Sequence, residues 1–199
     1  MGAAHGGRGE VVAMLLEAPG VDAAAKDEGG QTALMAAARS GSLKAVEALY
    51  ERGADLDARE DRGQTAMMWA AAHGHAEVVS WLVAQGADFR QPLRGGFTPF
   101  TFAIREGKMD VVRVLLEAGV DVNETMSPEK RNGRSVPRGM TPLLMAVENG
   151  HFEMAISLVE AGARPNDTSA GYAALHAISW VRKPDHGEGV NGMPPPDTT

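Results

Sequence analysis

Apolar residues fall into short runs with helical spacing, and each run ends near a glycine. After Gly74, the apolar positions match one face of a helix, namely Val78, Val79, Leu82 and Val83. Before that glycine, Met67, Ala70 and Ala71 share one face in the same way. We therefore predict a first helix over residues 66–73, a break at Gly74, and a second helix from about Ala76 to Gly86.

This pattern recurs along the chain in one register. Threonines that follow a Gly-x pair stand at Thr32, Thr65, Thr98 and Thr141, with spacings of 33, 33 and 43 residues. The glycines between the two helical runs, Gly41, Gly74, Gly107 and Gly150, keep the same spacings. A single ten-residue insertion explains the deviation. A period of this length is typical of a repeat protein, in which each unit buries its apolar face against its neighbours.

The register divides the chain into units. We predict a partial unit over 1–26, full units over 27–59, 60–92, 93–135 and 136–168, a partial unit over 169–181, and an irregular or disordered tail over 182–199. The insertion, at about 124–138, is interpreted as a long connection after the third full unit. It is either a tolerated, solvated loop or a finger that contacts a partner.

Several runs carry a family resemblance. Gly63-Gln-Thr-Ala-Met-Met-Trp-Ala-Ala71, Gly74-His-Ala-Glu-Val-Val79 and Gly119-Val-Asp-Val-Asn123 resemble the ankyrin repeat motif. The resemblance extends from about Gly2 to Trp180. It implies an all-α solenoid of stacked antiparallel helix pairs with projecting β-turn fingers, and a function in protein binding. Tyr172 to Trp180 would then form the first helix of the last unit.

A narrower resemblance concerns Gly30-Gln-Thr-Ala-Leu-Met-Ala-Ala-Ala38, Gly150-His-Phe-Glu-Met-Ala155 and Ala177-Ile-Ser-Trp-Val-Arg-Lys-Pro184. These runs are similar to those of a group of bacterial multi-ankyrin proteins whose members commonly begin with an export signal. The resemblance implies a bacterial origin. It leaves an exported, periplasmic location and a cytoplasmic one both open.

Composition and charge narrow the function classes. The chain has no cysteine, which excludes disulfides, thiolate metal sites and cysteine nucleophiles. Its net charge of −7 disfavours nucleic acid as a partner, and no apolar run approaches the length of a membrane helix. No set of titratable residues converges, so we predict a monomer without catalytic activity, cofactor or metal. His73 and His75 could suggest a metal site, but the repeat pattern favours a structural His75 whose ring bonds to backbone.

The resemblance places partner contacts on the finger tips and the first helices of the units. Mapped onto this chain, these positions are Asp61, Arg62, Gln64, His73, Phe97, Arg105, Glu106, Met140, Glu148, Asn149 and Tyr172. Three of them, Phe97, Met140 and Tyr172, are apolar or aromatic at a place where other units have glutamine. We expect these three at exposed tips that contact the partner, whereas Trp69 and Phe102 are interpreted as packing residues.

Three functions fit this sequence. The first is a protein-binding scaffold or adaptor, the second is the regulatory or targeting segment of a larger enzyme, and the third is a structural spacer. The chain begins inside a first helix and ends without a second one, so we expect a segment of a longer protein. Because end units have only one neighbour, residues 3–18 should exchange amide hydrogens faster than residues 66–83.

Overall fold

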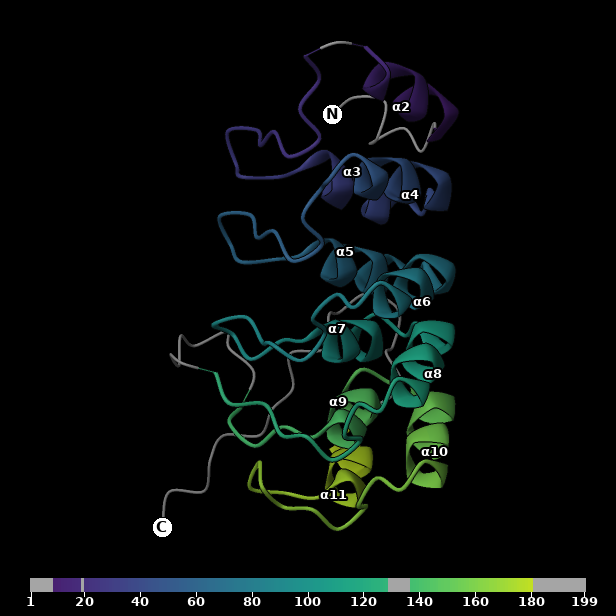
Figure 1. The fold of residues 1–199 in the computed structure, drawn as a ribbon. Coiled ribbons are helices and arrows are strands. Elements are labelled where there is room, and N and C mark those ends of the chain that lie inside the picture. Colours follow the sequence, from purple (N-terminus) through teal and green to yellow (C-terminus); the bar gives the residue numbers. More distant parts are fainter. Residues whose placement is uncertain (1–8, 19, 129–136, 181–199) are drawn as a thin grey trace, which may run out of the picture.

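The computed structural model describes residues 9–18, 20–128 and 137–180, and these form an elongated stack of helix pairs (Figure 1). The helices are α2 (Gly9–Leu16), α3 (Ala33–Ser40), α4 (Leu43–Glu51), α5 (Ala66–His73), α6 (Ala76–Ala84), α7 (Pro99–Arg105), α8 (Met109–Glu117), α9 (Pro142–Glu148), α10 (Phe152–Glu160) and α11 (Ala174–Trp180). The prediction for α5 and for the start of α6 is confirmed.

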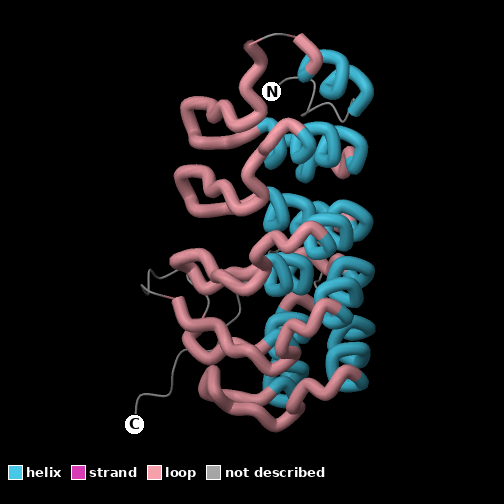
Figure 2. The backbone as a smooth tube through the Cα atoms, viewed as in Figure 1, coloured by secondary structure: helices cyan, strands magenta, loops and turns pink. Residues whose placement is uncertain are grey.

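The helices lie in two layers. The first helices of the units, α3, α5, α7, α9 and α11, pack on one another in sequence order, and we call them the inner helices. The second helices, α2, α4, α6, α8 and α10, form the outer layer. Loops project from the inner side of the stack (Figure 2). The described residues contain one isolated antiparallel β-bridge, which joins Lys26 and Thr32.

The recurring threonines begin the inner helices. The side-chain hydroxyl oxygen of Thr65 accepts a hydrogen bond from the backbone N–H of Met68, and Thr32, Thr98 and Thr141 act in the same way. Such N-caps satisfy a backbone donor that the first helical turn leaves free. The last unit has Ala173 at this place, and α11 begins at Ala174. The prediction that this helix starts at Tyr172 is therefore wrong, because the helix begins one residue after the capping position, as in the other units.

The core follows the same register. The leucines at equivalent places in the outer helices, Leu49, Leu82, Leu115 and Leu158, are fully buried. Small residues such as Ala70 and Ala71 of α5 are buried between neighbouring helices, which allows the thin units to approach closely. No helix in the described part of the chain is long and apolar enough to cross a membrane.

In the described part of the chain, projecting turns, which we call the fingers, occupy residues 27–31, 60–64 and 93–97, the two legs 126–128 and 137–140 of a fourth, and residues 168–172 of a fifth. Adjacent fingers are tied together by hydrogen bonds. The backbone N–H of Asp61 donates to the carbonyl of Gly29 at 3.1 Å, and the Lys26 ammonium donates to the carbonyl of Arg59 at 3.3 Å. The Arg59 guanidinium donates to the carbonyl of Gly63 and to Gln91 Oε1. These bonds make the first three fingers a preorganised surface.

The insertion belongs to the fourth finger. The backbone N–H of Met126 donates to the carbonyl of Met140 at 2.9 Å, as Glu60 does to Gln64 in the second finger. The additional residues therefore lie between the two legs of a finger. Of the two interpretations of this segment, the pairing favours a finger, and residues 129–136 themselves lie outside the described residues.

The first described helix leaves large apolar side chains exposed to solvent. In α2, Met14 is 70% exposed and Leu15 is 53% exposed, whereas Val78, Val79 and Leu82 of α6 are fully buried. We expect amides of residues 9–18 to exchange faster than those of 66–83, as measured by hydrogen–deuterium exchange. Equal or slower exchange in α2 would contradict this. The predicted helix fragment before Gly9 and the tail after 181 lie outside the described residues.

Candidate functional site

Fingers and inner helices together make one surface, which we call the inner face (Figure 2). Its second finger holds Asp61 and Arg62, both exposed, and the half-buried Gln64. Asp61 lies against Gly30 of the first finger, since a Cβ on that glycine would come within 2.9 Å of Asp61 Oδ1. The carboxylate therefore faces the neighbouring finger, and the exposed Arg62 forms no ion pair with any residue that the structure describes.

An aromatic cluster covers the end of α5. The guanidinium carbon of Arg39 lies 5.4 Å from the centre of the Trp69 ring, and the His73 ring lies 5.9 Å from it. The His73 Nδ1 atom is 3.0 Å from the carbonyl oxygen of Trp69, which makes it the donor of that bond. Trp69 Nε1 is buried and has no hydrogen-bond partner among the described residues. A buried donor without an acceptor is rare in proteins.

A second aromatic cluster lies in the next unit. The Phe97 and Phe102 rings are 5.0 Å apart, and the guanidinium carbon of Arg105 is 4.9 Å from each ring centre. Arg105 also forms an ion pair with Glu106 at 2.8 Å. The fold thus brings Phe97, Arg105 and Glu106 together and adds Phe102. Phe97 is half-buried and Phe102 is buried, so Phe97 keeps part of its ring available for contact.

Glu148 and Tyr172 form a pair across the fourth and fifth units. The Tyr172 hydroxyl donates a short hydrogen bond to Glu148 Oε1. Burial raises the pKa of Glu148, and the bond from Tyr172 partly offsets this effect. The pKa of Tyr172 is raised by burial and by the same carboxylate. Next to this pair, the Asn149 amide donates to the carbonyl of Met145 and thereby closes α9. The prediction of an exposed Tyr172 side chain is wrong, because this bond holds the half-buried ring against the last inner helices.

The prediction of an exposed Met140 is also wrong. Its side chain is 2% exposed and belongs to the apolar core together with Met126. Gln64 and Phe97 hold the same place in their fingers and are half-buried, so the physical reason is the buried Met126, with which Met140 pairs. Met140 lies in the leg that returns to α9 and pairs with Met126, whereas the turn itself is formed by Pro137 to Gly139. Met140 therefore cannot contact a partner in this conformation.

Replacing Tyr172 with Phe should raise the pKa of Glu148 further, because the buried carboxylate loses its donor. A carboxyl whose folded pKa lies above its unfolded value stabilises the fold below the unfolded value, and this stability is lost as pH rises through the folded pKa. In Y172F the loss should extend to higher pH. Carboxyl-carbon NMR titration of Glu148 measures the change. Tyr50→Phe, an outer-layer control, should leave the titration unchanged, and an unchanged midpoint in Y172F would contradict the bond.

The two Gly-His pairs have a structural function. His75 Nε2 lies 2.9 Å from the carbonyl oxygen of Arg39, and His151 Nε2 lies 3.0 Å from that of Arg105. Each imidazole thus links the start of an outer helix to the end of an inner helix one unit earlier. The predicted backbone bond of His75 is confirmed. No group of three or more metal-ligating side chains was found in residues 9–18, 20–128 and 137–180.

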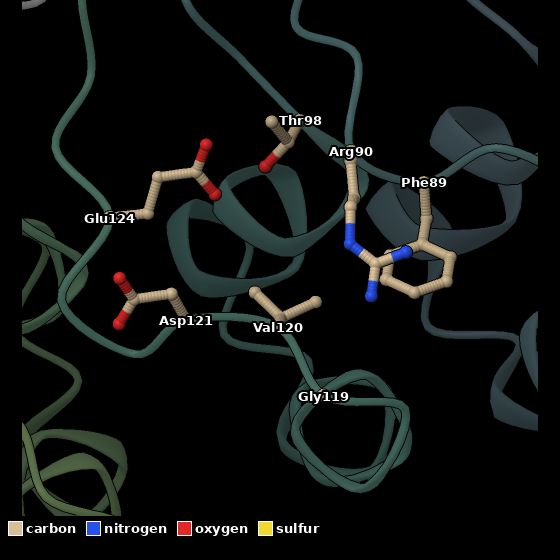
Figure 3. Close-up of a pocket in the computed structure, with 7 residues that line it drawn as sticks. All are labelled: Phe89, Arg90, Thr98, Gly119, Val120, Asp121 and Glu124. Carbon is tan, nitrogen blue, oxygen red and sulfur yellow. The ribbon is translucent and has the colours of Figure 1, made fainter.

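A pocket of about 300 Å³ lies among the loops around the start of α7 and the end of α8 (Figure 3). Phe89, Arg90, Thr98, Gly119, Val120, Asp121 and Glu124 line it. Burial raises the pKa of Glu124, as does the Asp121 carboxylate, and Arg90 partly offsets both effects. None of the predicted site residues lines this pocket.

Sequence reasoning missed Arg39 and undervalued Trp69. Arg39, Arg105 and Glu148 occupy equivalent places near the ends of α3, α7 and α9. The register that selected Arg105 and Glu148 therefore selects Arg39 as well. Trp69 was interpreted as a packing residue, yet its ring is only half-buried and lies next to Arg39 and His73.

Comparison with known families agrees with this architecture. A family model described as ankyrin repeats (3 copies) matches residues 1–60 and 53–126, and one described as ankyrin repeats (many copies) matches residues 100–159. No curated protein matches the chain. Neither model bears on the source organism, so the bacterial origin stays a prediction. Ankyrin repeats mediate protein–protein interactions and are typically not enzymes. The matches cover most of the 199 residues, and the chain belongs to the ankyrin repeat family.

Proposed function

We propose that this chain is an adaptor that holds a protein partner on its inner face. The observation that carries the proposal is the cluster of Arg39, Trp69 and His73 at the end of α5. The first unit has Ala36 at the place of Trp69, so the fold does not need a large ring there. A half-exposed tryptophan beside an arginine is the composition typical of interface anchors.

The rigid surface supports the same function. Fingers that are hydrogen-bonded to one another present side chains in fixed positions, which lowers the entropy cost of binding. The fourth finger, lengthened by the insertion, lies on this same face, and insertions in repeat proteins often fall on the binding face. We place the contacts on Arg39, Trp69 and His73, with Arg62 and Phe97 beside them.

Replacing Trp69 with Ala should weaken the partner complex by more than about 1 kcal/mol, because interface tryptophans contribute that much or more. Partners are first identified by capture on the full-length protein and mass spectrometry, and their affinity for purified variants is then measured by calorimetry. Trp81→Ala is the matched control. Trp81 is a half-buried tryptophan of the outer helix α6, whose ring contacts Tyr50. A complex weakened by W81A and unaffected by W69A would place the partner on the outer layer.

A further inference from the structure

Charge is divided unevenly between the two layers. The carboxylates of the outer helices are Glu10, Glu47, Glu51, Glu77, Asp110, Glu117, Glu153 and Glu160. Their basic residues among the described positions are Lys44 and Arg113, and each forms an ion pair with one of these carboxylates. The outer layer therefore accounts for much of the net charge of −7.

The inner face of the first units carries arginines among its carboxylates. Arg39 lies in the last turn of α3, Arg62 lies at the tip of the second finger, and Arg94 lies at the tip of the third. None of the three has a carboxylate within ion-pair distance in the part of the chain that the structure describes. Arg62 and Arg94 are exposed, and Arg39 is half-buried on Trp69.

Four carboxylates on the same face accept hydrogen bonds or form an ion pair, whereas Glu28 and Asp61 of the first two fingers are exposed. Asp27 Oδ1 accepts from the backbone N–H groups of Gly29 and Gln31, and Glu60 Oε1 accepts from that of Gln64. Glu106 pairs with Arg105, and Glu148 accepts from Tyr172. These bonds engage part of the negative charge of the face, and no carboxylate of the described residues lies within ion-pair distance of Arg39, Arg62 or Arg94.

The indole N–H of Trp69, which lies beside Arg39, could donate a hydrogen bond to an acceptor on a ligand. Within residues 9–18, 20–128 and 137–180, Trp69 Nε1 has no hydrogen-bond partner, and the guanidinium that lies over the same ring has no carboxylate within ion-pair distance. One ligand oxygen placed between them can accept from both, provided that the Arg39 side chain shifts to admit it. A carboxylate is the side-chain group that matches a guanidinium in charge and geometry.

We propose that the inner face from Arg39 to Arg94 takes an acidic segment of a partner protein. Carboxylates of that segment pair with Arg39, Arg62 and Arg94, and an apolar side chain of it packs on Trp69. The proposal rests on the adaptor function and names the partner class. A protein segment fits better than a nucleic acid, because the dense carboxylates of the outer layer repel a long polyanion, whereas a short acidic segment stays on the inner face.

A library of random 16-residue peptides displayed on phage, selected on the immobilised full chain, tests the partner class. We expect enriched peptides to be rich in Asp and Glu with at least one apolar residue. Their affinity should fall at least tenfold between low and high salt, since exposed ion pairs are screened. Enriched peptides that are neutral or basic, yet lose affinity in W69A, would overturn this proposal and leave the adaptor function standing. No enrichment, or binding unaffected by W69A, would count against the adaptor function itself.

Two charge-matched variants locate the site. R39Q/R62Q/R94Q should weaken an enriched acidic peptide at least tenfold and flatten its salt dependence. The control K44Q/R52Q/R113Q removes the same charge from the outer side and should change affinity less than twofold. Equal losses in both variants would show a general charge effect and overturn the site. The last measurement is the affinity of the chain for a labelled single-stranded DNA of about 20 nucleotides. If the chain bound this DNA more tightly than the peptide, the choice of a protein partner would be overturned. Circular dichroism checks that each variant folds.

Discussion

Replacing Gly139 with Ala should lower the free energy of unfolding by about 3–5 kcal/mol, at the upper end of single substitutions. Gly139 ends the turn of the fourth finger with a φ of 83°. An L-residue with a side chain pays about 1–2 kcal/mol in this left-handed region. That conformational cost is the smaller part of the expected effect.

The larger part is a collision between fingers. A Cβ on Gly139 would lie 2.1 Å from the carbonyl oxygen of Ser169 and 2.4 Å from its carbonyl carbon. Both atoms are backbone of the fifth finger, so no side-chain rotation relieves the contact. The fourth and fifth fingers would have to separate, and well-packed structures pay roughly 1–3 kcal/mol or more for such shifts.

The control is Gly150→Ala. Gly150 has a φ of 75°, but a Cβ there meets no atom within 4 Å. It therefore carries the conformational cost alone, about 1–2 kcal/mol. Urea unfolding followed by circular dichroism measures both variants. Similar losses in the two would show that the fourth and fifth fingers do not pack as closely as the structure has them.

Much of the fold was predictable because the same sequence features recur in every repeat. A threonine that caps an inner helix and a leucine that fills the outer core recur at fixed spacing, so each unit confirms its neighbours. This redundancy fails where one unit differs. The insertion has no counterpart, and spacing alone cannot say whether ten residues lengthen a connection or a finger. The backbone hydrogen bond between Met126 and Met140 indicates that the insertion lengthens a finger. That bond is seen only in the folded structure and cannot be read from the sequence.

The sequence indicates which positions of the repeat are equivalent, but it does not indicate how exposed the side chain at each of these positions is. Equivalent places in the repeat hold Gln64, Phe97, Met140 and Tyr172, yet Met140 is in the core and Tyr172 is bonded to Glu148. The environment of each place depends on the adjacent finger, which differs from unit to unit. Trp69 and Phe102 show the same effect, since they share a register position and differ in burial.

Met140→Gln tests this difference most directly. We expect the free energy of unfolding to fall by about 2–4 kcal/mol, because the change removes a buried apolar side chain and buries an amide in its place. Phe97→Gln, at the equivalent place in the third finger, should cost about 1 kcal/mol, mostly through lost contact with Phe102. The half-buried Gln31 and Gln64 show that glutamine is tolerated where this position is partly solvated.

Met140→Leu separates polarity from shape. A volume-conserving apolar replacement in a core costs less than about 1.5 kcal/mol, so M140L should be clearly more stable than M140Q in urea unfolding. If M140Q were as stable as M140L, the side chain would be solvated and the exposed position expected from the repeat pattern would be right after all. If both variants lost several kcal/mol, the site would depend on the flexible thioether filling an irregular space between Met126 and the inner helices, and polarity would not be the deciding factor.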